Sequence, residues 1–166
     1  MKFVAIAALF TVASGSLYAQ NVDVKNAWVR ASVQGQKATG AFMQLTASQP
    51  TTLVGVASPV AGVAEVHEMK MDGDVMRMRA LPQGLPLPAG QPVALTPGGY
   101  HVMLMDLKAT LPKDSTIPLT LTFKDAKGVE STQELTLPVA TSAPGMPAMP
   151  AAGAAGHGHG HGAAKH

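Results

Sequence analysis

Short apolar runs with a two-residue period dominate the middle of the chain and predict β-strands. In the clearest run, Leu119, Leu121 and Phe123 alternate with threonines, which is the period of a half-buried strand. Comparable runs at residues 27–30, 40–46, 52–56 and 129–137 lie between Gly, Pro, Asp and Ser turn residues, with no amphipathic helix of useful length among them. The pattern predicts an all-β domain, a sandwich or a barrel of about 120 residues.

The two ends of the chain depart from this pattern, so we predict three segments. Residues 1–19 have the features of a secretory signal peptide, because Lys2 precedes an apolar stretch too short to span a bilayer and Ala19 offers a cleavage point. A short membrane anchor or a buried helix is the alternative for that segment. Residues 20–140 would form the β domain. Residues 141–166 are almost entirely Ala, Gly, Pro, Met and His, so we expect a disordered C-terminal tail.

The composition limits the chemistry available to the domain. The chain has no cysteine and ten methionines, against four phenylalanines, two tyrosines and one tryptophan. An exported protein that binds a soft metal without thiolates has thioether and imidazole side chains as ligands. The formal net charge is +2 and no basic run is present, which argues against nucleic acid as a partner. No other apolar stretch has transmembrane length, so we expect no membrane span after signal removal.

Residues 65–78 predict a β-hairpin with histidine and methionine on one face. The dipeptide Asp72-Gly73 is a strong signal for a two-residue loop, because such a turn needs positive φ at both central positions. Opposed residues of a hairpin project from the same face, with Cβ atoms roughly 4.5–5.5 Å apart. The predicted opposed pairs are Met71–Asp74, Met69–Met76 and His67–Met78 on the ligand face, and Glu68–Arg77 on the other face.

The tripeptide His101-Val102-Met103 supplies a second pair of candidate ligands. Residues two apart on a strand share a face, so His101 and Met103 point the same way. If this strand lies beside the hairpin, four ligands converge on one ion: His67, Met78, His101 and Met103. Two imidazoles and two thioethers without a carboxylate suit Cu(I), or Ag(I) as its mimic, whereas Zn(II) usually takes a carboxylate or thiolate.

The other methionines of the domain have two interpretations. Met69, Met71 and Met76 share the predicted ligand face, where they would line a rim for a docking partner or serve as accessory donors. Met43 and Met105 are predicted to be core residues. Because methionine commonly fills gaps in hydrophobic cores, core packing is the alternative for each of these side chains.

These motifs resemble the PCuAC family of periplasmic copper chaperones. The family motif is a His, a Met after ten residues, and a His-x-Met about twenty residues further on. Here ten residues separate His67 from Met78, and twenty-two separate Met78 from His101. Similar landmarks at residues 27–30, 88–90, 95–99, 101–108 and 119–123 extend the resemblance over about residues 22–138.

The resemblance implies a cupredoxin-like β-sandwich with an exposed Cu(I) site and a periplasmic location. It also implies delivery of Cu(I) towards the copper centre of cytochrome c oxidase, either directly to its copper-accepting domain or through a Sco-type thiol protein. A passive copper sink that retains the metal would need the same ligands and is the alternative. An enzyme is not expected, because the predicted mature terminus, Gln20, is not the histidine that oxidative copper enzymes often use. A sandwich that binds no metal is the remaining option.

The tail contains a second candidate metal site. Its members are two methionines followed by histidines in a Gly-rich repeat: Met146, Met149, His157, His159, His161 and His166. A flexible His-Gly repeat can place imidazoles around Cu(II), which prefers nitrogen donors in a tetragonal arrangement. Such a tail would gather Cu(II) near the sandwich, although His tracts also bind Zn(II) and Ni(II). An expression tag or incidental low complexity is the alternative.

Overall fold

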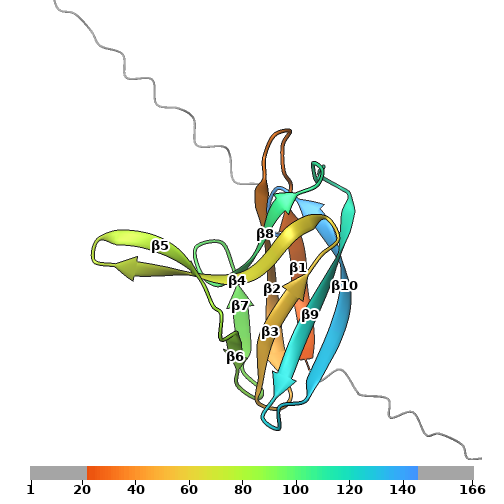
Figure 1. Cartoon of the computed structure of the whole chain (residues 1–166). Helices are drawn as coiled ribbons and strands as arrows, with labels where there is room; N and C mark the ends of the chain where they lie inside the picture. The colour runs from red at the N-terminus through yellow and green to blue at the C-terminus, as the bar shows by residue number, and fades with distance from the viewer. Residues whose placement is uncertain (1–21, 146–166) are drawn as a thin grey trace, which may run out of the picture.

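The computed structural model describes residues 22–145, and every regular element among them is a β-strand (Figure 1). The strands are β1 (Val22–Arg30), β2 (Ala38–Ala47), β3 (Thr51–Ala57), β4 (Ala61–Asp72), β5 (Val75–Ala80), β6 (Leu85–Leu87), β7 (Pro92–Leu95), β8 (His101–Leu107), β9 (Thr116–Asp125) and β10 (Glu130–Ala140). The predicted signal segment and the tail from residue 146 onward lie outside the described residues. The prediction of an all-β, cupredoxin-like fold is confirmed.

Two layers of mostly antiparallel strands form the sandwich. Strands lie side by side in the order β5-β4-β8-β2-β1-β10-β9-β3-β6, and β7 pairs with the second half of β2. The parallel contact between β1 and β10 joins the two layers. None of residues 22–145 forms a helix long and apolar enough to cross a membrane.

Apolar side chains at every second position of the strands fill the space between the layers. Leu119, Leu121 and Phe123 of β9 are buried in the core, as their two-residue period predicts. On β8, Val102 and Leu104 are fully buried in the same core. The intervening residues of β8, from His101 to Met105, therefore project from the outer face of the sheet.

Two methionines test the prediction of core packing, and one of them contradicts it. Met43 of β2 is buried in the core, as predicted. Met105 lies on the outer face of β8 and is only half-buried, so its assignment to the core is wrong. The reason is the alternation of side chains along β8. Val102 and Leu104 point into the core, so Met105, one residue further on, points to the outer face.

The β4–β5 hairpin projects away from the sandwich (Figure 1). The first part of β4, from Ala61 to His67, pairs with β8, whereas the part beyond His67 pairs with β5 alone. All six residues of β5 are exposed. The hairpin is thus a two-stranded ribbon whose base belongs to the sheet and whose tip stands in solvent.

The predicted loop of this hairpin is wrong by one residue. Asp72 pairs with Val75, so the loop is Gly73-Asp74, and the opposed pairs are Met71–Met76, Met69–Met78, His67–Ala80 and Glu68–Arg79. Gly73 has φ of +62° whereas Asp74 is not among the residues with positive φ. A turn with glycine at its first central position needs positive φ only there, so Asp74 avoids a strained backbone.

The segment between residues 81 and 95 contains two short strands that the sequence pattern did not predict. β6 pairs with β3, and β7 continues the edge of β2 where the pairing of β2 with β8 ends. Leu85, Leu87 and Leu95 from this segment are buried in the core. Prolines and glycines between these leucines interrupt the alternating pattern from which strands are predicted.

Candidate metal site

Three adjacent strands bring the four predicted ligands to one face of the sheet. His67 of β4 is paired directly with His101 of β8, and Glu65 is paired with Met103. Met78 of β5 is opposite Met69, which lies two residues from His67 on β4 and so shares its face. This face is the outer one, because the alternate residues of β8 enter the core.

The distances place His101 beside both Met78 and His67. Nε2 of His101 lies 3.2 Å from Sδ of Met78. The rings of His67 and His101 meet edge to face, with centroids 5.9 Å apart. Met103 lines the same surface depression of about 300 Å³ as His101, Met78 and Met69. Both histidines are 7% exposed, whereas Met78 is 47% exposed.

The ring of His101 is held in the tautomer that leaves Nε2 free to bind a metal. Its Nδ1 lies 3.0 Å from the carbonyl oxygen of Gly99, which can only accept a hydrogen bond. Nδ1 of the neutral ring therefore carries the proton, and Nε2 directs a lone pair towards the Met78 sulfur. Such lone pairs repel each other unless a cation binds both. For a tetrahedral ion with bond lengths like those at zinc sites, the nitrogen and sulfur would be about 3.6 Å apart.

His67 presents the opposite tautomer. Its Nε2 lies 2.9 Å from Oε2 of Glu65, a carboxylate that accepts the ring proton. Nδ1 is buried and is the one buried side-chain nitrogen or oxygen among residues 22–145 without a hydrogen-bond partner. An unpaired buried acceptor is costly, and a bound metal ion would satisfy it.

Glu65 changes the predicted description of the site. The sequence interpretation had no carboxylate near the ligands, but the structure places one on His67. A carboxylate that accepts a hydrogen bond from the N–H of the non-ligating ring nitrogen fixes the tautomer and orientation of a metal-binding histidine. The i,i+2 spacing of Glu65 and His67 on one strand was the signal available in the sequence.

The ring of Phe42 lines the depression and was not predicted as part of it. The ring of Phe42 lies 6.5 Å from that of His101 and 4.8 Å from that of Trp28, between centroids. The guanidinium of Arg30 lies 5.3 Å from the Phe42 centroid. Gly40, opposite Met103, leaves the space that Phe42 needs, since a Cβ there would lie 2.7 Å from the Phe42 ring.

The carbonyl of Gly99 links the hairpin to the histidine pair. It accepts a hydrogen bond from the backbone N–H of Met69, at 3.2 Å, as well as the one from His101. The loop between β7 and β8 thus fixes both the ring orientation on β8 and the height of the hairpin beside it.

Met69, Met71 and Met76, the predicted rim donors, lie on the ligand face. Met69 lines the depression, whereas Met71 and Met76 stand further out along the ribbon and are about half exposed. Within residues 22–145 no three His, Cys, Asp or Glu side chains gather closely enough to hold a metal by themselves. The tail donors predicted from Met146 to His166 lie outside the described residues.

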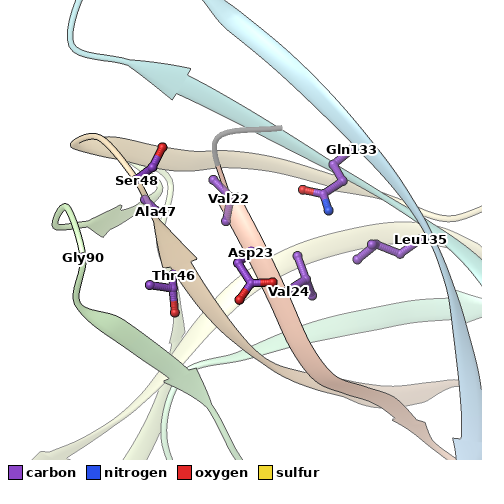
Figure 2. Close-up of a pocket in the computed structure, with 9 residues that line it drawn as sticks. All are labelled: Val22, Asp23, Val24, Thr46, Ala47, Ser48, Gly90, Gln133 and Leu135. Carbon is purple, nitrogen blue, oxygen red and sulfur yellow. The ribbon is translucent and has the colours of Figure 1, made fainter. Parts of the chain in front are cut away.

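A larger cavity, of about 580 Å³, lies at the other end of β2 (Figure 2). Figure 2 shows Asp23, Thr46 and Gln133 around it, together with small and aliphatic side chains. It is lined by neither imidazole nor thioether groups and brings no set of catalytic or metal-binding side chains together. The His/Met cluster is therefore the better candidate site.

A cupredoxin-like sandwich with a His/Met cluster on its outer face is the class of protein that these features define. The model of the family described as "Putative lipoprotein LpqE-like" matches residues 22–139. The chain belongs to this LpqE-like family. The "Putative lipoprotein Lxx21020" of Leifsonia xyli subsp. xyli (strain CTCB07) is 36% identical to it over 121 residues, which are 73% of this chain and 70% of the relative.

Solved structures of PCuAC domains and of DR1885 have the same fold. The solution structure of apo-DR1885 from Deinococcus radiodurans is 31% identical, with a TM-score of 0.56, and the match covers 86% of this chain and 95% of that one. The Cu(I) form of DR1885 is 30% identical, with a TM-score of 0.56 and coverage of 77% and 83%. The apo PCuAC domain from PmoF1 is 25% identical, with a TM-score of 0.54 and coverage of 72% and 94%. These matches support a PCuAC-type family, while the role of the four residues as ligands stays a prediction.

The two histidines should have opposite tautomers in the metal-free protein. Long-range ¹H–¹⁵N correlation spectra, recorded where both rings are neutral, should show His101 protonated at Nδ1 and His67 at Nε2, because Gly99 and Glu65 each accept one ring proton. As a control, Glu65→Ala should release the tautomer of His67 and leave that of His101 unchanged. The same tautomer for both wild-type rings would contradict the described geometry.

Proposed function

We propose that this protein is an exported copper chaperone that binds Cu(I) through His67, Met78, His101 and Met103 and delivers it to a partner. The contact between His101 Nε2 and Met78 Sδ carries the proposal, because two metal-binding lone pairs face each other there at 3.2 Å. The similarity to the Cu(I) form of DR1885 supports copper as the metal.

The donor set favours a soft, monovalent ion. Two neutral imidazoles and two thioethers bring no negative charge, so the four ligands do not offset the charge of the ion. Glu65 moderates that charge from behind His67, through the hydrogen bond to its Nε2. A divalent ion would leave more charge uncompensated beside the ring of Phe42, at a larger desolvation cost.

The uneven exposure of the ligands suits transfer. The two histidines are buried and held by hydrogen bonds at their second nitrogens, so they form the fixed half of the site. Met78 stands on the exposed hairpin and is the ligand that a partner can reach first. Thioethers are weak neutral donors, so incoming thiolates can replace them one at a time while copper stays as Cu(I).

Location and partner follow from the resemblance. The family and the relative are both described as lipoproteins, which supports export, although the chain has no cysteine to carry a thioether-linked lipid. Residues 1–19 would serve as a signal peptide that directs the protein to the periplasm. The acceptor would be the copper-accepting domain of cytochrome c oxidase, a Sco-type thiol protein, or both. The role is binding and transfer and not catalysis.

The tail would act as a separate collector of copper. Four of the six histidines of the chain lie in residues 157–166. Bound Cu(II) there would be held at a raised local concentration near the sandwich, because the tail is covalently attached to it.

Replacing one sulfur ligand should weaken Cu(I) binding without unfolding the domain. Met78→Leu and Met103→Leu keep the side-chain volume but remove the sulfur donor. Each should lower Cu(I) affinity by about 100-fold or more, because loss of groups that merely orient a metal ligand typically costs about 10- to 100-fold. Competition with a Cu(I)-specific chelator measures the affinity, and thermal unfolding checks the fold. Met105→Leu, on the same face of β8, is the matched control and should bind normally; normal binding in both ligand variants would refute the assigned site.

Delivery can be separated from retention by a transfer experiment. The Cu(I)-loaded protein, mixed anaerobically with the metal-free copper-accepting domain of an oxidase or with a Sco-type protein, should lose most of its copper to a partner that offers thiolates. Metal analysis after chromatographic separation measures the distribution. If the copper stays on this protein in the presence of each of the two acceptors, the protein is a copper sink and not a chaperone.

Removing residues 146–166 should distinguish Cu(II) binding by the tail from Cu(I) binding by the sandwich. The shortened chain keeps every described strand and should keep full Cu(I) affinity, while losing most of its Cu(II) binding along with the imidazole-rich repeat. Titration of each ion into both forms measures the effect. Undiminished Cu(II) binding after truncation would exclude the tail as collector.

A further inference from the structure

The exposed methionines of the hairpin have no packing role in the sandwich. Met71, Met76 and Met78 are 55%, 51% and 47% exposed, and none of them belongs to the core cluster. Large apolar side chains on a projecting two-stranded ribbon gain little burial, and such ribbons are marginally stable by themselves. Burial alone therefore does not account for three thioethers on this ribbon.

The observed register arranges the hairpin methionines in two rungs. Met71 is opposite Met76, and Met69 is opposite Met78. Opposed Cβ atoms are roughly 4.5–5.5 Å apart, so the long and flexible side chains of one rung can bring both sulfurs to a single ion. The second rung lies about 6.6–6.8 Å further along the ribbon, towards the histidines.

Among the paired residues from Glu68 to Arg79, the charged side chains lie on the face opposite the methionines. Nε of Arg77 lies 2.8 Å from Oδ2 of Asp72, and Arg79 pairs with Glu68. These ion pairs connect the two strands and leave the methionine face with neutral sulfur donors. A hard ion finds no oxygen ligand in the rungs, whereas a soft monovalent ion finds up to four thioethers.

We propose that Met71 and Met76 form a second, weaker site for a soft monovalent cation, Cu(I) or Ag(I), which exchanges its ion with the His/Met site through Met69 and Met78. The inference rests on the proposed function, since Met78 is the residue that both sites share. Its sulfur belongs to the inner rung and also lies 3.2 Å from Nε2 of His101.

Each transfer step is a ligand exchange. A bond from copper to a sulfur of the outer rung breaks as a bond to Met69 or Met78 forms, and the bond to His101 follows in the same way. Copper stays Cu(I) throughout, and no proton moves because thioethers do not titrate at accessible pH. The outer site is the weaker one because it offers two exposed thioethers and no imidazole.

The test uses the full chain with ¹³C-labelled methionine methyl groups and Ag(I) as the probe. In the wild type, the first Ag(I) added should shift the methyl signals of Met78 and Met103, and further Ag(I) should shift those of Met71 and Met76. The double variant Met71→Leu/Met76→Leu should lose the later step and keep the first. Met105→Leu, with its methionine off the ribbon, should keep both steps. The tail is present in every form and contributes equally.

The outcomes separate the two proposals. If Met78 and Met103 respond while Met71 and Met76 stay unchanged at every Ag(I) level, the outer site is refuted and the primary site stands. If Met71 and Met76 respond while Met78 and Met103 do not, the primary site is refuted. A second readout is the rate of Cu(I) loading, which should fall several-fold in the double variant at unchanged primary affinity. An unchanged rate would overturn the exchange route.

Discussion

The pairing of β4 with β8 is the constraint on which the site depends. The backbone ladder between these strands sets His67 directly opposite His101 and Glu65 opposite Met103. Opposed positions share a face and are held at a fixed separation, so the ladder brings the two imidazoles together, while the Gly99 carbonyl orients the ring of His101. Core packing anchors the ladder from the other side, because Val66 on β4 and Val102 on β8 are both buried.

Placing the cluster on the outer face of the sheet allows burial and access together. The ring of Phe42 lies beside that of His101 and packs on Trp28, and Met78 of the hairpin contacts His101 from β5. Both imidazoles are nearly buried, whereas Met78 reaches the solvent. A site inside the core would hold metal without releasing it. At a fully exposed site, water would compete at every ligand and the orienting hydrogen bonds would be weaker.

The predicted ligand face of the hairpin is right although the predicted loop is wrong by one residue. Moving the loop from Asp72-Gly73 to Gly73-Asp74 shifts every cross-strand partner by two residues. Because side chains alternate with a period of two, that shift changes which residues are opposed and leaves each one on its face. Met78 moves from a place opposite His67 to one opposite Met69, and His101 becomes its imidazole partner.

Local pattern was enough to predict the strands of β9 and β10, the shared face of His101 and Met103, and a hairpin that presents histidine and methionine together. These features depend on alternation and turn residues, which are local properties of the chain. The contacts of Glu65, Gly99 and Phe42 with the two histidines could not be predicted in this way. They depend on which strands become neighbours and in which register, and that is decided by packing between residues far apart in the sequence. The sequence by itself therefore determined the donor chemistry, whereas the tertiary structure decided which donors meet, because the partners in each pair come from segments that only the folded sheet brings together.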